Sequence, residues 1–145
     1  RSYDGGFALA PGGESHGGST YCCVAALLLT GVTPGPSVVD WCARRQHGGG
    51  LCGRPNNPPD SCYSFWIGAA LRAMEVDVLD DGAVTRFVLA CENHLVGGFA
   101  KFADDAPPDL LHSFYSLCWL SWHDQRLNAI DPLLGISARH TNIVR

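Results

Sequence analysis

Residues 49–74 read GGLCGRPNNPPDSCYSFWIGAALRAM, in which a glycine pair leads into a polar, proline-rich loop and then into an apolar run. The same order occurs before and after this stretch. The glycine pairs begin at Gly5, Gly49 and Gly97, which are 44 and 48 residues apart. Self-similarity at this period is typical of repeat proteins, in which each repeat packs against its neighbours.

Each repeat is predicted to hold two helices. The apolar runs mix small residues with leucine and aromatic side chains, as helices that are buried nearly all round do. These runs are Ser19–Leu29, Tyr63–Met74 and Leu110–Trp122. The more amphipathic stretches between them are Ser37–Gln46 and Asp81–Asn93. Asp60 and Asp109 stand where helix N-caps belong, and no stretch predicts a strand.

We therefore expect an all-α fold of the α/α toroid type. Inner and outer helices would alternate in it, and the loops at one end would carry function. Five helices are too few to close such a ring, so the chain is expected to form an incomplete arc of the barrel.

The composition favours a chain with a deep pocket or a partner. Of its 145 residues, 46% are hydrophobic and 17% are charged, and so much apolar surface needs a pocket, a partner or further chain to cover it. The net charge of −4 gives no support for nucleic-acid binding. No apolar run is long enough to predict a membrane span. Seven cysteines without a secretory signal predict reduced thiols and a cytoplasmic protein, although the chain begins at Arg1 and a lost leader stays open.

One loop carries the residues for a metal site. Asp60 and Cys62 lie two apart where the chain enters a helix, so both side chains can turn toward one point. His112 opens the corresponding helix one repeat later. An aspartate, a cysteine and a histidine with one open position form a catalytic zinc set, and their ligand atoms should lie within about 4 Å of one another. Taken singly, the three residues also have ordinary explanations, as an N-cap, a buried thiol and a helix-start histidine.

A second group of residues predicts a diphosphate site. His16 precedes Gly17 and Gly18 at a helix start, where glycines permit close backbone approach and the helix N-terminus attracts anions. Arg54 and Tyr63 would add fixed donors to phosphate oxygens. The alternative is a glycine-rich turn with an exposed histidine. Aromatic side chains that face inward would line an apolar tunnel, and the candidates are Phe65, Trp66, Phe114, Tyr115 and Trp119.

Three motifs together resemble those of protein prenyltransferase β subunits. They are residues 14–22 (ESHGGSTYC), residues 60–66 (DSCYSFW) and His112. The first resembles the diphosphate-site helix start of that family, and the others resemble its zinc motif and zinc histidine. The resemblance fades after about Ser137. It therefore assigns residues 1–137 to the C-terminal part of a prenyltransferase toroid and residues 138–145 to a tail.

Within the family, the chain most resembles geranylgeranyltransferase type I. Leu111 is similar to that class, whereas farnesyltransferases have an aromatic residue before the zinc histidine. Lys101 stands where farnesyltransferases place a magnesium-binding aspartate. A lysine neutralises diphosphate charge without a metal, so the resemblance implies that Mg²⁺ is not required. The chain departs from the family at Asn57, where a diphosphate-contacting lysine is usual, and its loop 101–112 is one residue longer.

The resemblance implies transfer of geranylgeranyl from geranylgeranyl diphosphate to the cysteine of a C-terminal CaaX motif, in a heterodimer with an α subunit. The expected Zn²⁺ ligands are Asp60, Cys62 and His112, which form the expected catalytic set together with Tyr63. The expected diphosphate ligands are His16, Arg54, Tyr63 and Lys101.

Two other interpretations stay open. One is a farnesyltransferase β subunit, which a preference for farnesyl would favour. The other is a non-catalytic α/α repeat fragment that only binds partners, an interpretation supported by Asn57 and by the absence of the N-terminal half of the barrel. Stoichiometric zinc binding separates them from each other, because a pure scaffold has no reason to bind zinc.

Overall fold

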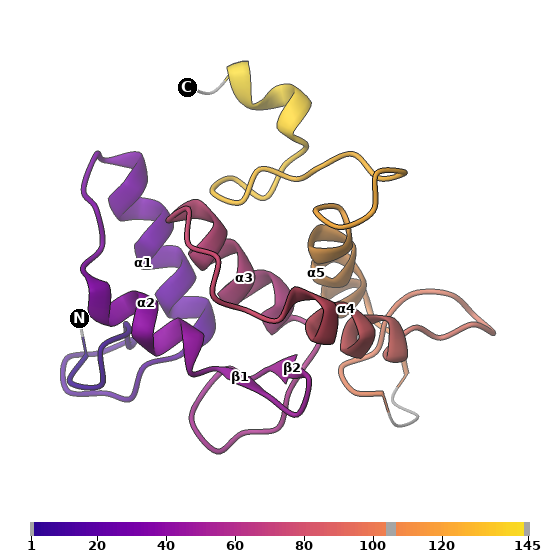
Figure 1. Cartoon of the computed structure of the whole chain (residues 1–145), viewed down its shortest axis with the longest axis horizontal. Helices are drawn as coiled ribbons and strands as arrows, with labels where there is room; N and C mark the ends of the chain where they lie inside the picture. Colours follow the sequence, from indigo (N-terminus) through magenta and orange to yellow (C-terminus); the bar gives the residue numbers. More distant parts are fainter. Residues whose placement is uncertain (1, 104–106, 144–145) are drawn as a thin grey trace.

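The computed structural model describes residues 2–103 and 107–143, and this part of the chain is mostly helical (Figure 1). In chain order its elements are α1 (Gly17–Leu29), α2 (Pro36–Ala43), β1 (Gln46–His47), β2 (Gly50–Leu51), α3 (Tyr63–Ala73), α4 (Asp81–Ala90), α5 (Leu110–Leu120) and the 3-10 helix η1 (Ala138–Ile143). The predicted helices are all present, with ends that differ by a few residues.

The helices alternate between two layers. Helix α3 packs against α1 on one side and against α5 on the other, so these three helices lie side by side (Figure 1). Helix α2 packs against α3, and α4 packs against α5 and β2. Helices α1, α3 and α5 each begin after a loop that follows a glycine pair. The predicted site residues therefore lie in these loops and in the first turns of the three helices.

Helix α3 is largely buried because it has inner neighbours on both sides. Ile67, Ala69 and Ala70 have no exposed surface. A side-chain carbon added at Gly68 would lie 2.6 Å from the Trp119 ring of α5, so only glycine lets the two helices come this close. The mixture of small and large residues that predicts a buried helix thus also sets the spacing between α3 and α5.

Two local predictions are wrong. No strand is predicted, yet β1 and β2 form an antiparallel hairpin whose turn places Gly48 and Gly49 at φ of 55° and 83°, where glycine has no steric penalty. Asp60 is predicted to cap the third helix, but α3 begins only at Tyr63 and has Cys62 at its N-cap position. The carboxylate of Asp60 instead accepts a hydrogen bond from the Cys62 N–H (3.0 Å), within the turn before the helix.

The C-terminal segment returns to the inner helices. The Tyr21 hydroxyl of α1 donates to the Leu133 carbonyl (3.1 Å), and Trp122 Nε1 donates to the Ile130 carbonyl (2.7 Å). The predicted tail begins with η1, and its last two residues, 144 and 145, lie outside the described part of the chain. The division after Ser137 stays a prediction. No helix within the described residues is both long enough and apolar enough for a membrane crossing.

Candidate metal and diphosphate site

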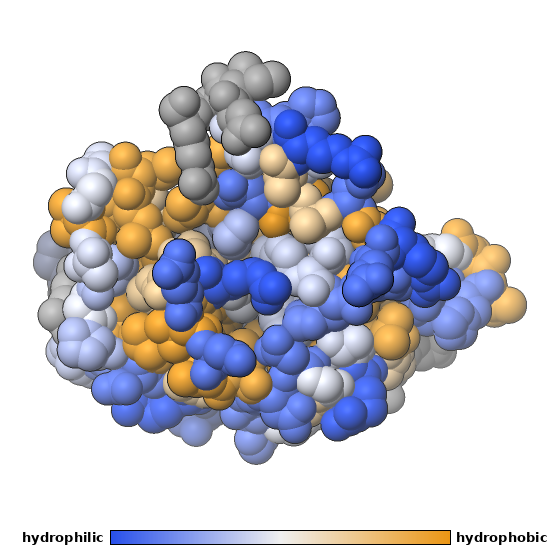
Figure 2. All heavy atoms as spheres, turned by 45° about the horizontal axis from the view of Figure 1, so that its top comes forward, coloured by the Kyte–Doolittle hydropathy of each residue, from blue (hydrophilic) through white to orange (hydrophobic). Residues whose placement is uncertain are grey.

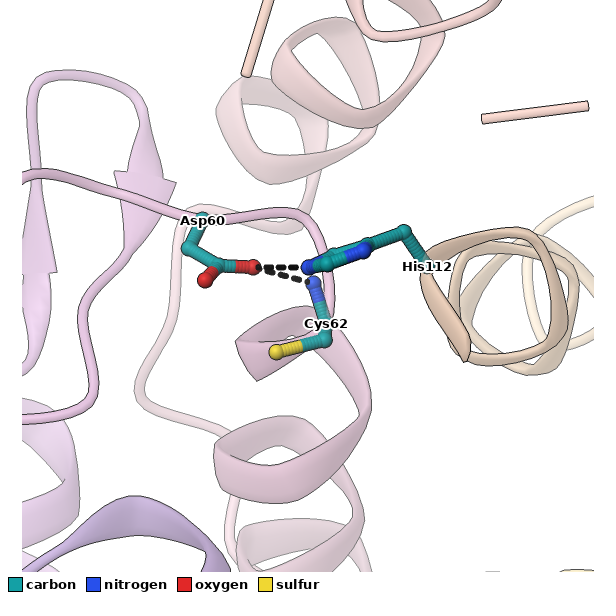
Figure 3. Close-up of side chains that lie close together, drawn as sticks. All are labelled: Asp60, Cys62 and His112. Carbon is teal, nitrogen blue, oxygen red and sulfur yellow. Dashed lines mark hydrogen bonds and ion pairs between the residues drawn. The ribbon is translucent and has the colours of Figure 1, made fainter. Parts of the chain in front are cut away.

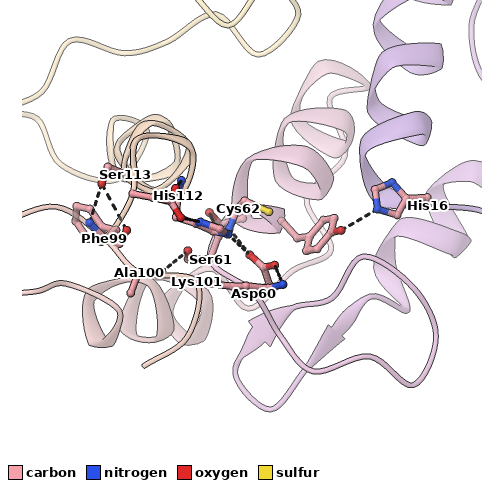
Figure 4. A network of polar contacts seen from close by, with 12 residues as sticks. His16, Asp60, Ser61, Cys62, Phe99, Ala100, Lys101, His112 and Ser113 are labelled. Carbon is pink, nitrogen blue, oxygen red and sulfur yellow. Dashed lines mark hydrogen bonds and ion pairs between the residues drawn. The ribbon is translucent and has the colours of Figure 1, made fainter. Parts of the chain in front are cut away.

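The turn that carries Asp60 and Cys62 is held between two repeats. The Asp60 N–H donates to the Leu51 carbonyl of β2 (3.0 Å). Ser61 is fully buried, and it donates from its N–H to the Lys101 carbonyl (3.0 Å) and from its hydroxyl to the Ala100 carbonyl (2.7 Å; Figure 4). Backbone of the following repeat therefore helps to fix the turn that carries Asp60 and Cys62.

The three predicted metal ligands meet at one point, although they come from two elements. Ligand atoms of Asp60, Cys62 and His112 lie within 4.8 Å of one another, slightly wider than the expected 4 Å (Figure 3). Asp60 Oδ1 is 3.3 Å from His112 Nε2. Among residues 2–103 and 107–143, this is the one group of three or more histidine, cysteine or acidic side chains with such spacing.

The electrostatic surroundings of Cys62 oppose an uncompensated thiolate. Burial raises the pKa of the Cys62 thiol well above its ordinary value, and the neighbouring Asp60 carboxylate raises it further. The Lys101 ammonium, 3.7 Å from Asp60 Oδ2, acts in the opposite direction and lowers that pKa. The site thus combines one sulfur, one nitrogen and one oxygen donor, and a cation bound among them would stabilise the Cys62 thiolate.

His112 contacts carboxylates through both ring nitrogens. While Nε2 faces Asp60, Nδ1 lies 2.6 Å from Asp109 Oδ2. The other oxygen of Asp109 accepts from the His112 N–H (2.9 Å), so Asp109 is the N-cap of α5, as predicted. Sequence analysis missed the contact between the two side chains. An aspartate at the N-cap with a histidine three residues later is the pattern that could have indicated it.

His16 and Tyr63 form a second polar pair, across α1 and α3. His16 caps α1: its Nδ1 accepts a hydrogen bond from the Gly18 N–H (3.1 Å). Nε2 lies 2.8 Å from the Tyr63 hydroxyl oxygen. Because Nδ1 is an acceptor, a neutral His16 carries its proton on Nε2 and donates it to Tyr63. Burial and the charge of Arg54 both lower the pKa of His16, which favours this neutral form.

The Tyr63 hydroxyl is left with its own proton free to donate. Burial raises the pKa of Tyr63 to about 12, so the phenol stays protonated at neutral pH. Its ring lies against the backbone of Gly53, where an added side-chain carbon would overlap the phenol. Gly53 also accepts from the Gly17 N–H (2.9 Å), which ties the loop to the start of α1.

The two predicted cations have separate partners. Arg54 is exposed and its Nε lies 4.0 Å from Glu14 Oε2, whereas Lys101 pairs with Asp60. The structure therefore joins His16 to Tyr63 and Lys101 to the metal ligands. That all four predicted diphosphate ligands face one bound diphosphate stays a prediction. Asn57 is exposed and adds no charge to this end of the molecule.

Comparison with known proteins assigns the family. The prenyltransferase alpha-alpha toroid domain matches residues 1–136. The chain belongs to this family. It is 42% identical over 153 aligned residues to a geranylgeranyl transferase type-1 β subunit of Arabidopsis thaliana, covering 94% of this chain and 40% of that protein. A counterpart from Dictyostelium discoideum is 36% identical over 145 residues, covering 95% of this chain and 41% of that protein.

A solved structure agrees with these relatives. Candida albicans protein geranylgeranyltransferase-I complexed with GGPP superposes with a TM-score of 0.87 at 29% identity, covering 97% of this chain and 45% of the other. The chain thus spans about two fifths of the length of the curated relatives. The predicted α/α toroid and the resemblance to type I β subunits are both confirmed.

In this prenyltransferase chain, three of the five predicted aromatic residues form one wall along the inner helices. Of the other two, Trp119 is buried and donates from Nε1 to the Thr85 hydroxyl of α4 (3.0 Å), and Phe114 is exposed. Phe65 stacks on Tyr115 with ring centroids 4.9 Å apart, and Trp66 lies 4.3 Å from Tyr115. Tyr21 of α1 joins the group through Phe65 at 5.0 Å. Phe65 is buried, whereas Trp66 and Tyr115 keep partial exposure. The wall therefore joins the facing surfaces of α1, α3 and α5.

Proposed function

We propose that this chain is a portion of the β subunit of a zinc-dependent protein geranylgeranyltransferase type I. The enzyme would transfer geranylgeranyl from its diphosphate to the cysteine of a C-terminal CaaX motif. The observation that carries the proposal is the meeting of Asp60, Cys62 and His112 in a chain similar to type I β subunits over 94% of its length.

The donor set fits zinc. A sulfur, an imidazole nitrogen and a carboxylate oxygen leave one position open, which is the pattern of catalytic rather than structural zinc. When bound there, zinc would lower the pKa of a substrate thiol in the open position. Asp60, Cys62 and His112 would hold the ion, and the hydrogen bonds of Ser61 would keep the turn in place.

The polar residues beside the metal cluster would stabilise the leaving group. As the substrate sulfur bonds to C1 of the lipid and the C1–O bond breaks, negative charge moves onto the diphosphate. Tyr63 has a proton to donate because His16 already fills its acceptor position. Arg54 and Lys101 would supply positive charge, and Lys101 would take the place of Mg²⁺. The aromatic wall would contact the isoprenoid. An α subunit would complete the enzyme, which would act in the cytoplasm.

Lipid preference and zinc content test this function together. The full-length gene product that contains this chain is to be purified with a prenyltransferase α subunit and assayed with a CaaX peptide. We expect one zinc per heterodimer, faster transfer of geranylgeranyl than of farnesyl, and no need for added Mg²⁺. Faster farnesyl transfer would instead identify a farnesyltransferase. A complex that binds no zinc and transfers neither lipid would be a scaffold.

The position of Tyr63 gives a more local prediction. In Gly53→Ala, the new methyl group would displace the phenol and break its bond to His16. We expect the single-turnover rate of transfer to fall about 100-fold, with zinc content unchanged. Gly82→Ala is the matched control, because Gly82 is exposed in the first turn of α4. A Gly53→Ala enzyme with the wild-type rate would show that the Tyr63 position is not needed.

A further inference from the structure

The carboxylate of Asp109 contacts only His112 among the side chains of the described residues, and it uses both oxygens. Oδ1 accepts from the His112 N–H (2.9 Å), and Oδ2 lies 2.6 Å from Nδ1 of the same residue. An N-cap needs only the first of these bonds. The second bond reaches the imidazole ring, whose side chain is 13% exposed, and fixes its rotation.

The contact between Nδ1 and Asp109 also decides which ring nitrogen of His112 has a free lone pair for a metal. An ionised carboxylate can only accept hydrogen bonds, so Nδ1 must carry the proton. In the neutral ring, Nε2 is then unprotonated, and it points at Asp60 Oδ1 from 3.3 Å. Two electron-pair donors facing each other at this distance are suited to a cation placed between them.

We infer that Asp109 is a positioning residue for the metal: it orients the His112 ring and holds the tautomer that presents Nε2. The inference rests on the proposed zinc-dependent function. A carboxylate on the remote nitrogen of a ligating histidine also makes the imidazole a stronger donor. Asp109 therefore adds to zinc affinity without touching the ion, through a side chain that is half exposed.

The fold supplies a matched control for the capping role. Asp80 caps α4 through the same bond, in which its Oδ1 accepts from the Ala83 N–H (2.9 Å). Within the described residues, its carboxylate contacts no histidine. Asp80→Asn therefore changes a cap aspartate with no expected effect on zinc. Two variants of Asp109 keep the capping bond as well, since asparagine and serine are both good N-caps.

These two variants differ in what they present to the ring. Asp109→Asn can cap with its carbonyl oxygen, and its NH₂ group then faces Nδ1. This arrangement favours the tautomer with its proton on Nε2, and a protonated Nε2 cannot bind a metal. Asp109→Ser caps the helix but is too short to reach Nδ1, so the ring is free to rotate. Both should weaken zinc binding, the first through the tautomer and the second through orientation.

The test is zinc affinity, measured by competition with a chelator on the metal-free heterodimer. We expect Asp109→Asn and Asp109→Ser to lower affinity about 10- to 100-fold. The melting temperature of the metal-free protein should stay close to that of Asp80→Asn, which keeps wild-type affinity. In a His112→Ala background, Asp109→Asn should have no further effect on affinity, because its route to the metal is gone.

The outcomes separate the inference from the function on which it rests. Wild-type zinc affinity in both Asp109 variants would overturn the positioning role and leave the proposed enzyme intact. An equal loss in the His112→Ala background would also overturn it, because Asp109 would then act without His112. A wild-type heterodimer that binds no zinc would overturn the proposed function itself.

Discussion

Replacing Cys62 or His112 with alanine is expected to abolish both zinc retention and prenyl transfer in the assembled enzyme. Each residue supplies one of the three donors that meet within 4.8 Å. Removing one donor leaves two, which should bind the ion so weakly that a chelator removes it during dialysis, although the residual affinity can still be measured by competition. The loss of affinity should exceed the roughly 10- to 100-fold effect of a residue that only orients a ligand.

Zinc content after dialysis against a chelator measures this effect, together with single-turnover transfer to a CaaX peptide. Cys118→Ala is the matched control, because Cys118 of α5 is also a buried free thiol and belongs to no metal cluster among the described residues. It should retain one zinc per heterodimer. A Cys62→Ala enzyme that still holds one zinc would show that the metal, if any, binds elsewhere.

The sequence predicts the members of this cluster because they follow the repeat. Asp60 and Cys62 lie two residues apart where the chain enters one helix, and His112 lies in the first turn of the corresponding helix one repeat later. Three inner helices that start at one end then bring these positions together. Phe65, Trp66 and Tyr115 of the aromatic wall are predicted because they come from the apolar runs of the repeats, whereas the contribution of Tyr21 is not predicted.

What the sequence does not predict depends on local geometry. Asp60 looks like a helix cap, but a turn intervenes before Tyr63, and the carboxylate is free to face His112. The second bond of Asp109 requires a particular rotamer of His112, which periodicity does not encode. The bond between His16 and Tyr63 joins residues 47 positions apart. Burial, which the sequence does not specify, raises the pKa values of Cys62 and Tyr63.

Helices α1 and α5 lie at the two ends of the inner layer. Each therefore has only α3 as an inner neighbour, whereas α3 has two inner neighbours. Helix α5 exposes an apolar stripe at one-turn intervals, in which Leu110, Phe114 and Leu117 are 90%, 48% and 47% exposed. Leu29 at the end of α1 is 54% exposed. Figure 2 shows apolar surface gathered on the side where α1 and α2 lie. In a repeat protein, such faces are normally covered by the next repeat or by a polar cap.

The 145-residue chain on its own is therefore expected to self-associate and to transfer no lipid. Its relatives are more than twice its length, so further helices are available in this family to cover the apolar stripe of α5 and the exposed end of α1. Apolar patches larger than a few hundred Å² on a free surface favour association. Under the proposed function, transfer also needs an α subunit, which the isolated chain would lack.

Light scattering after gel filtration of the isolated chain checks association, and an assay with CaaX peptide, zinc and geranylgeranyl diphosphate checks transfer. Replacing Leu110, Phe114 and Leu117 with polar residues should reduce association, because these side chains project from the exposed face of α5. The same replacements should not restore transfer. A monodisperse monomer that transfers geranylgeranyl by itself would mean that the chain needs no further repeat, and that its exposed stripes serve a purpose other than closing a ring.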